Sequence, residues 1–336
     1  MKRNFRLHFI VAAILLLILF AADLLTGSAG IAPGEVWDIL SGSPADTNSS
    51  LIIWNIRLPK ALTAMIAGAA VSLSGLLMQT LFMNPLAGPY VLGISSGASL
   101  GAALCVLGVS SGMTAGMAPL LENLGIAGAA WAGAAIVLAV IMAASRKIGD
   151  NTVLLVLGMM LGAGIDSVVL ILQYLSDEQA LKSYIVWTMG SLGNISGARL
   201  WIMAGTVLAG AAVAGALCKP LNLLLTGENY AASAGTDVRQ TRSLVFAATV
   251  LLAGTVTAFC GPLGFIGLAV PHLARLFTGT ADHRILVPGT ALYGSCIMLA
   301  CDIAAKSAAL PVNAVTSLAG IPVVIWIVLG NRRRGF

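Results

Sequence analysis

The sequence is dominated by apolar runs about as long as a membrane is thick. Of its 336 residues, 58% are hydrophobic and 9% are charged, whereas a soluble domain carries roughly 25% charged residues. A helix crosses a bilayer with about 20 apolar residues, and in lipid its backbone groups must be paired within the segment. The composition therefore predicts an all-α membrane protein, a polytopic helix bundle forming a single transmembrane domain over residues 1–336.

Polar or Gly/Pro-rich breaks divide the chain into ten predicted spans. The eighth is too short to cross a bilayer alone, so we expect residues 261–278 to form a broken, partly re-entrant element buried among neighbouring helices. The ten predicted spans are residues 8–25, 60–82, 92–111, 124–145, 153–174, 199–217, 243–260, 268–278, 285–304 and 315–330.

The first span also resembles a signal peptide, because a basic start precedes an apolar run. That run continues to Leu25 without a small-residue cleavage site, so we interpret it as a span.

The basic residues predict how the chain lies in the membrane. With both termini in the cytoplasm, only five of the 18 Lys and Arg residues fall outside, as the positive-inside rule requires. The net charge of +5 therefore reflects orientation, and no nucleic-acid partner is expected. The five outer cations are Arg57, Lys60, Lys182, Arg199 and Lys306.

Two similar breaks suggest an internal repeat. Residues 84–93 resemble residues 261–269, and five spans separate them. An odd separation reverses orientation, which predicts the inverted-repeat halves found in transporters. Chance similarity in a Gly-rich chain is the alternative. Small residues such as Gly68, Gly97 and Gly101 predict close helix packing.

No segment carries the chemistry of an enzyme. The chain lacks a Gly-x-x-x-x-Gly-Lys-Ser/Thr loop for phosphate. Its three histidines lie far apart, without a nucleophile and base. We therefore expect no catalysis, no cofactor and no metal site, and any ATP must be hydrolysed by a partner.

The loop at residues 219–242 predicts one or two short helices, the first ended by Gly227 and the second by Gly235. Such a helix suits docking into a groove on a partner protein. An interfacial helix lying on lipid is the alternative. The small residues expected on its docking face are Ala231, Ala232 and Ala234.

An ordered series of motifs resembles the iron-chelate and vitamin B12 permease family of type II ATP-binding-cassette (ABC) importers. The series covers nearly the whole chain. Its motifs are Arg57-Leu-Pro-Lys60, Gly68-Ala-Ala, Met78-Gln-Thr-Leu-Phe, Asn84-Pro-Leu-Ala, Leu92-Gly-Ile-Ser-Ser-Gly-Ala, Trp187-Thr-Met-Gly-Ser-Leu, Gly227-Glu, the run from Gly261 to Arg275, Asp282-His-Arg and Leu310-Pro-Val.

The resemblance implies a permease subunit in the bacterial cytoplasmic (inner) membrane. Its implied partners are a cytoplasmic ABC ATPase dimer, an extracytoplasmic substrate-binding protein, membrane lipid and a second permease copy, for which we expect a homodimer. The implied cargo is a metal chelate, with a ferric siderophore expected first, then haem, then cobalamin. The alternatives are a secondary transporter driven by an ion gradient, in which Asp166 would act, and a structural subunit without transport.

The resemblance also implies roles for particular residues. The coupling helix that contacts the ATPase is expected to include Glu228, Ala231, Ala232, Gly235 and Asp237. Docking of the binding protein is expected at Arg57, Lys60 and Lys306, for which anchoring of a helix end at the membrane interface is the alternative. Two of these are lysine where the best-known B12 relative has arginine, so point-charge contacts are expected. A cytoplasmic gate is implied at Asn151 and Thr152, with Leu86 as a second constriction.

Three polar residues have structural alternatives to a transport role. Asn151 is also placed to cap a helix. Asp166 and Asp302 fall inside apolar segments, where a carboxylate must face protein or water. Asp166 lines the pathway or is structural, and Asp302 is expected to pair with Lys306, four residues along the same helix face.

Overall fold

The described secondary structure is helical. The computed structural model describes residues 5–42, 47–108 and 118–331, and these ranges contain helices and connections but no β-strand. The α-helices are α1 Phe5–Leu25, α2 Pro33–Ser41, α3 Thr47–Ile52, α4 Leu58–Leu81, α5 Ile94–Ala103, α6 Ala118–Ser145, α7 Asn151–Leu175, α8 Glu178–Thr188, α9 Ala198–Ala216, α10 Cys218–Leu224, α11 Glu228–Ser233, α12 Val238–Thr249, α13 Thr255–Cys260, α14 Ile266–Thr278, α15 His283–Ala308 and α16 Val312–Asn331. The π-helical turns are η1 Ile53–Arg57, η3 Leu104–Gly108 and η5 Val250–Gly254, and η2 Pro89–Leu92 is a 3-10 helix.

The helices suit a membrane in length and composition. Within the described residues, seven are long and apolar enough to cross one, and three more are apolar but shorter. Every predicted span overlaps one of these helices, and the predicted short eighth span is α14, which follows an irregular stretch at residues 261–265. The fold class is confirmed, while the number of helices that cross the membrane stays a prediction.

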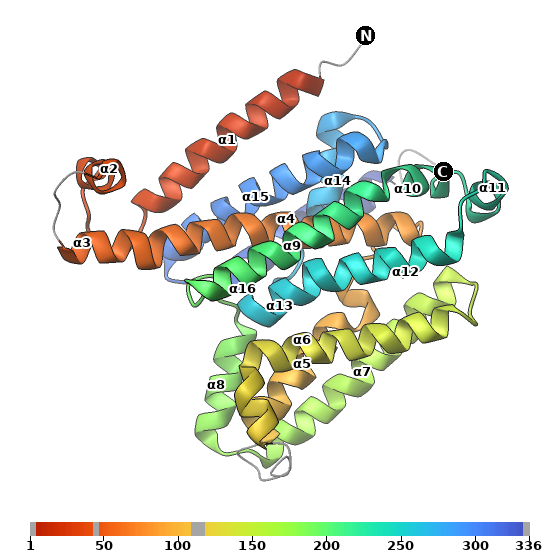
Figure 1. The fold of residues 1–336 in the computed structure, drawn as a ribbon, viewed down its shortest axis with the longest axis horizontal. Helices are drawn as coiled ribbons and strands as arrows, with labels where there is room; N and C mark the ends of the chain where they lie inside the picture. The colour runs from red at the N-terminus through yellow and green to blue at the C-terminus, as the bar shows by residue number, and fades with distance from the viewer. Residues whose placement is uncertain (1–4, 43–46, 109–117, 332–336) are drawn as a thin grey trace.

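Helix α4 lies at the centre of the bundle and packs along α15 and α14 (Figure 1). Glycine makes this approach possible. A Cβ on Gly68 would lie 2.2 Å from the carbonyl oxygen of Gly294, and one on Gly75 would lie 1.7 Å from that of Gly267. The predicted small-residue packing is therefore present, because the two helix backbones touch where side chains would otherwise separate them.

Helices α5 to α7 form a second layer beside this centre, with α8 at one end (Figure 1). Here α5 packs against α6, and a Cβ on Gly97 would lie 2.6 Å from the carbonyl oxygen of Gly133. The two similar breaks meet between the layers, where the Tyr90 hydroxyl donates a hydrogen bond to the carbonyl of Leu263. The inverted relation of the two halves stays a prediction.

The second predicted span begins earlier than expected. Its helix runs from Thr47 through the π-helical turn η1 into α4, because Arg57 is turned inward and does not end the apolar segment. Two further helices, α2 and α8, were not predicted. Both are too short and too polar to be recognised in the sequence as membrane spans.

Different helices lie at the two ends of the bundle. Figure 1 shows α10 and α11 at one end, and α2, α3 and the beginning of α4 at the other. We call these the α11 end and the Lys60 end.

Candidate coupling and docking sites

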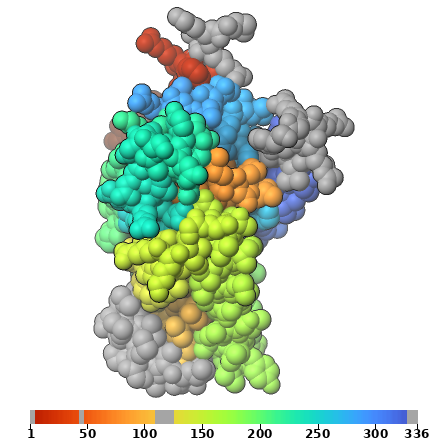
Figure 2. All heavy atoms as spheres, turned by 90° about the vertical axis from the view of Figure 1, so that its right-hand side faces the viewer, coloured from red at the N-terminus to blue at the C-terminus, as the bar shows by residue number. Residues whose placement is uncertain are grey.

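Helix α11 projects at the α11 end between two glycines. Gly227 precedes it with φ 106° and Gly235 follows it with φ 85°, a left-handed backbone that favours glycine. One or two short helices were predicted in this loop, and the structure has two, α10 and α11. Figure 2 views this end and shows the teal residues of α11 and α12 as a lobe on the surface.

The docking face of α11 differs from the predicted one. Ala231 is buried and anchors the helix to the rest of the chain, so it does not face a partner. The exposed residues of the helix and the turn after it are Asn229, Tyr230, Ala232, Ser233, Ala234 and Gly235. Asp237 caps α12, accepting a hydrogen bond of 2.9 Å from the backbone N–H of Gln240.

Glu228, at the beginning of α11, points back into the protein. Its Oε1 accepts one hydrogen bond from Arg242 Nη2 and one from Asn151 Nδ2, each 2.9 Å long. Arg242 Nη2 also donates to Asn151 Oδ1 at 3.1 Å. The structure thus joins a predicted coupling residue to a predicted gate residue through an arginine that had no predicted role.

Asn151 is not a helix cap. The cap of α7 is Asp150, whose Oδ1 accepts from the backbone N–H groups of Thr152 at 2.7 Å and Val153 at 3.3 Å. Asn151 instead donates to the carbonyl of Leu81, the last residue of α4, at 3.1 Å. Thr152 and Leu86 are exposed on the described chain, and their gating role stays a prediction.

A groove of about 400 Å³ runs beside α11. It lies between the end of α9, α10 and α12, and Gly235 and Asp237 contribute to its wall. A second contact holds this region to the bundle: Asn222 of α10 donates to Asp282 at 2.6 Å and accepts from the backbone N–H of His283 at 2.8 Å. Hydrogen bonds from the Arg284 backbone and from Asn222 lower the pKa of Asp282.

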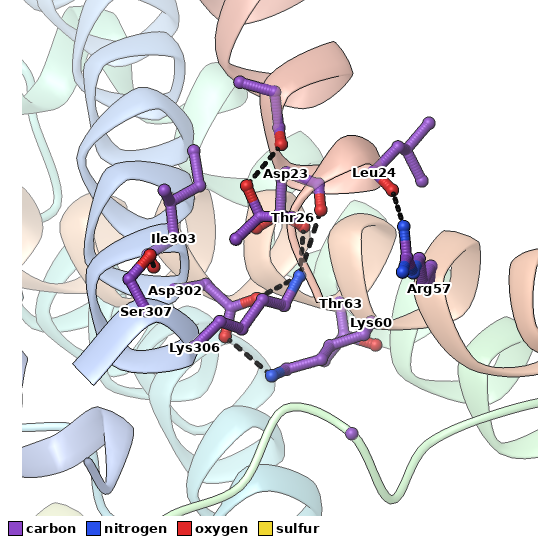
Figure 3. Close-up of polar contacts among 12 residues, drawn as sticks. Asp23, Leu24, Thr26, Arg57, Lys60, Thr63, Asp302, Ile303, Lys306 and Ser307 are labelled. Atoms are coloured by element: carbon purple, nitrogen blue, oxygen red, sulfur yellow. Dashed lines mark hydrogen bonds and ion pairs between the residues drawn. The ribbon is translucent and has the colours of Figure 1, made fainter. Parts of the chain in front are cut away.

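At the Lys60 end, two lysines and two aspartates form a compact cluster (Figure 3). Lys306 contacts Asp23 at 2.8 Å and Asp302 at 2.9 Å, and Lys60 contacts Asp302 at 3.1 Å. The expected pair of Asp302 with Lys306 is confirmed. Both carboxylates are at most 1% exposed, and the cluster ties α1, α4 and α15 together.

The three predicted docking cations differ in exposure. Only Lys60 keeps a substantial exposed fraction, at 24% of its side chain, against 10% for Lys306. Arg57 is 4% exposed and donates to the carbonyls of Leu24, at 2.9 Å, and Ala29. Intramolecular acceptors hold the side chains of Arg57 and Lys306 inside, and docking of the binding protein at the three cations stays a prediction.

Sequence reasoning missed two central residues of these sites, Arg242 and Asp23. In the sequence, Arg242 is one of several basic residues on the predicted cytoplasmic side, and Asp23 lies near the end of an apolar run that leads into a polar loop. Because charged residues are common at the ends of spans, nothing in the sequence indicated that either residue belongs to a site. Their partners lie 14 to 283 residues away along the chain.

Comparison with known proteins shows the family of the chain. The sequence profile of the FecCD transport family matches residues 15–330. The hemin transport system permease protein HmuU of Yersinia pestis is 36% identical over 328 residues, covering 96% of this chain and 95% of the relative. The vitamin B12 import system permease protein BtuC of Citrobacter koseri is 35% identical, covering 96% and 93%.

Among solved structures, a metal-chelate type ABC transporter in an inward-facing conformation matches with a TM-score of 0.82. It is 27% identical and covers 97% of this chain and 99% of that one. The fold, the family profile and both relatives agree over almost the full length, so the chain belongs to the FecCD transport family and is a multi-span membrane permease subunit, not an enzyme.

Proposed function

We propose that this chain forms the pathway of an ATP-driven importer for a bulky metal chelate. One observation carries the proposal. A short helix, α11, stands between two spanning segments, is anchored by buried Ala231 and exposes Ala232 and Ser233 beside the larger Tyr230. An exposed helix of this kind can dock in a cleft on a cytoplasmic ATPase. In this orientation both termini lie in the cytoplasm and the Lys60 end faces outward, as the distribution of cations favours.

We further propose that the Lys60 end docks the substrate-binding protein. A cavity of about 180 Å³ opens there, lined by Lys60, Asp302 and residues of the 190–193 loop. Lys60 shares Asp302 with Lys306, so it can turn to an acidic group on a partner while Asp302 keeps a cation. Arg57 and Lys306 then stabilise this surface through their contacts with buried acceptors. Lys60→Glu is expected to weaken binding-protein affinity about tenfold or more, mainly at low salt.

The pathway is proposed to form against a second copy of the chain. Asp166 lies in the middle of α7 and is exposed on the single chain, as are Ala163, Ser167 and Leu170 on the same helix face. An ionised carboxylate facing lipid there is costly, so this face must border protein or water. A homodimer with α7 beside the pathway satisfies this requirement. Lipid then covers the remaining apolar helix surfaces.

The proposed cargo class is a metal chelate. Two relatives are named for hemin and vitamin B12 transport, and the structural neighbour is a metal-chelate transporter. A ferric siderophore belongs to the same chemical class and stays among the cargoes to test.

The test is uptake of labelled haem, cobalamin and ferric siderophores by a strain lacking this chain. The strain is complemented with the wild type, with Ala232→Arg on the exposed face of α11, or with Gly215→Arg. Gly215 lies at the same end, in open space at the end of α9, so it controls for an added arginine. We expect the wild type and Gly215→Arg, but not Ala232→Arg, to restore uptake of one cargo. Full uptake with Ala232→Arg would refute ATPase docking at α11, and an unimpaired deletion strain would refute the importer.

A further inference from the structure

Beneath the exposed face of α11, one polar cluster joins four parts of the chain. Glu228 belongs to α11, Arg242 to α12, Asn151 to the beginning of α7, and the carbonyl of Leu81 to the end of α4. Glu228 and Arg242 are 14 residues apart, whereas Asn151 lies 70 residues after Leu81 and 77 before Glu228. A displacement of α11 therefore acts directly on α7 and α4 through these hydrogen bonds.

Arg242 holds the centre of this cluster. Its side chain is 7% exposed, and besides Glu228 and Asn151 it donates to the carbonyls of Ile148 at 3.3 Å and Gly149 at 3.4 Å. Arg242 is therefore also hydrogen-bonded to the connection between α6 and α7. A planar guanidinium supplies donors in several fixed directions, which lysine does not.

Glu228 is the only carboxylate that contacts the Arg242 guanidinium within the described residues. A buried arginine that loses its carboxylate keeps an uncompensated charge in a poorly solvated place. If the partner protein pulls α11 away from the bundle, the ion pair between Glu228 and Arg242 persists only when Arg242 moves with it. Because Arg242 is also hydrogen-bonded to Asn151, the beginning of α7 then moves too. The ion pair thus favours concerted movement of α11 and α7 over movement of α11 alone.

We propose that Arg242 is the positioning residue that transmits movement of α11 to the beginning of α7, and so links ATP hydrolysis to opening of the pathway. This inference rests on the proposed function, because it takes α11 as the contact with the ATPase. It assigns a role to a residue outside the predicted coupling, docking and gate sets. Asn151 acts in it as the receiver of the movement.

The experiment measures cargo molecules transported per ATP hydrolysed. The complete importer, co-purified with its ATPase, is reconstituted in liposomes with its binding protein and the cargo identified by the uptake screen. The variants are Arg242→Gln, Arg242→Lys, Glu228→Gln and the double Gln variant. The matched control is Arg284→Gln, which removes an exposed arginine from the first turn of α15 at the same end.

We expect Arg242→Gln to lower transport per ATP by about fivefold or more, the lower range of measured couplings between sites. Glu228→Gln should also lower the number of cargo molecules transported per ATP. The double variant should be no worse than Arg242→Gln, because both changes break one contact. Arg242→Lys, which keeps the charge, should recover part of the loss, and Arg284→Gln should leave the ratio unchanged.

A purely structural role predicts something else. Poor folding removes assembled importer, so transport and ATPase activity then fall together and their ratio stays constant. A constant ratio in Arg242→Gln and Glu228→Gln overturns the inference. If the Arg242→Gln importer does not assemble, Glu228→Gln decides alone, since it leaves Arg242 its contacts with Asn151 and the loop carbonyls. A wild-type importer without ATP-dependent uptake would instead refute the proposed function.

Discussion

Replacing Lys306 by methionine should destabilise the folded permease far more than the same change at Lys60. Lys306 lies between two buried carboxylates, at 2.8 Å from Asp23 and 2.9 Å from Asp302. At an effective dielectric constant of about 20, each contact contributes roughly 6 kcal/mol of Coulomb attraction before desolvation is counted. Most of this offsets the cost of burying the charges, and removal of one partner of a buried pair costs about 3–5 kcal/mol net.

The matched variant Lys60→Met removes a lysine that is partly exposed and contacts only Asp302 within the cluster. Asp302 keeps Lys306, so we expect a loss of about 1 kcal/mol or less, as for a solvent-screened pair. The free energy of unfolding is measured for both variants by denaturant titration of the purified permease in mixed micelles. The double variant Asp23→Asn with Lys306→Met should recover part of the loss, since one buried charge is then removed.

Equal losses in Lys306→Met and Lys60→Met would refute this reasoning. So would a double variant that is less stable than Lys306→Met alone. Either result would mean that Lys306 is not the cation that compensates the two buried aspartates in the folded protein.

Three further predictions concern the bundle and its α11 end. Gly75→Ala should cost about 1–3 kcal/mol in the same titration, because the added Cβ meets the carbonyl of Gly267 at 1.7 Å; Gly205→Ala, in open space, should not destabilise. Asp150→Ala should cost about 1 kcal/mol through loss of the α7 cap, and an unchanged unfolding midpoint would contradict it. The lowered pKa of Asp282 means that its contribution is present above its ordinary pKa of 3.8 and is lost as the pH falls below it. The wild type should therefore lose more stability than Asp282→Asn when the pH is lowered through this region, and parallel losses would argue against the interaction.

Much of the fold follows from local sequence patterns. Apolar runs, Gly/Pro breaks and the positions of basic residues are enough to place the spans, the short α14 and the helices of the loop at residues 219–242. Each of these depends on the polarity of residues close together in the chain. The family follows as well, because its motifs recur in order.

The sites were only partly predictable. Glu228 and Asn151 were expected in separate roles, and nothing in their sequence neighbourhoods pairs them. The loop of α11 was expected to turn three alanines toward a partner, yet Ala231 faces inward. A helix of six residues is too short for periodicity to identify its buried side.

The sequence alone therefore determined the class of protein, its long apolar helices and the short helices of the loop at residues 219–242, because lipid imposes a length and a polarity on every segment that crosses it. Only the tertiary structure decided what the charged residues do. In the sequence, the same description fits three cations at the ends of predicted spans: Lys306, Arg57 and Arg242. In the structure, the packing of α1 on α15 and of α11 near α7 places acceptors around each of them. A charge near a membrane is held by its three-dimensional neighbours, and those neighbours are set by helix packing across distant parts of the chain.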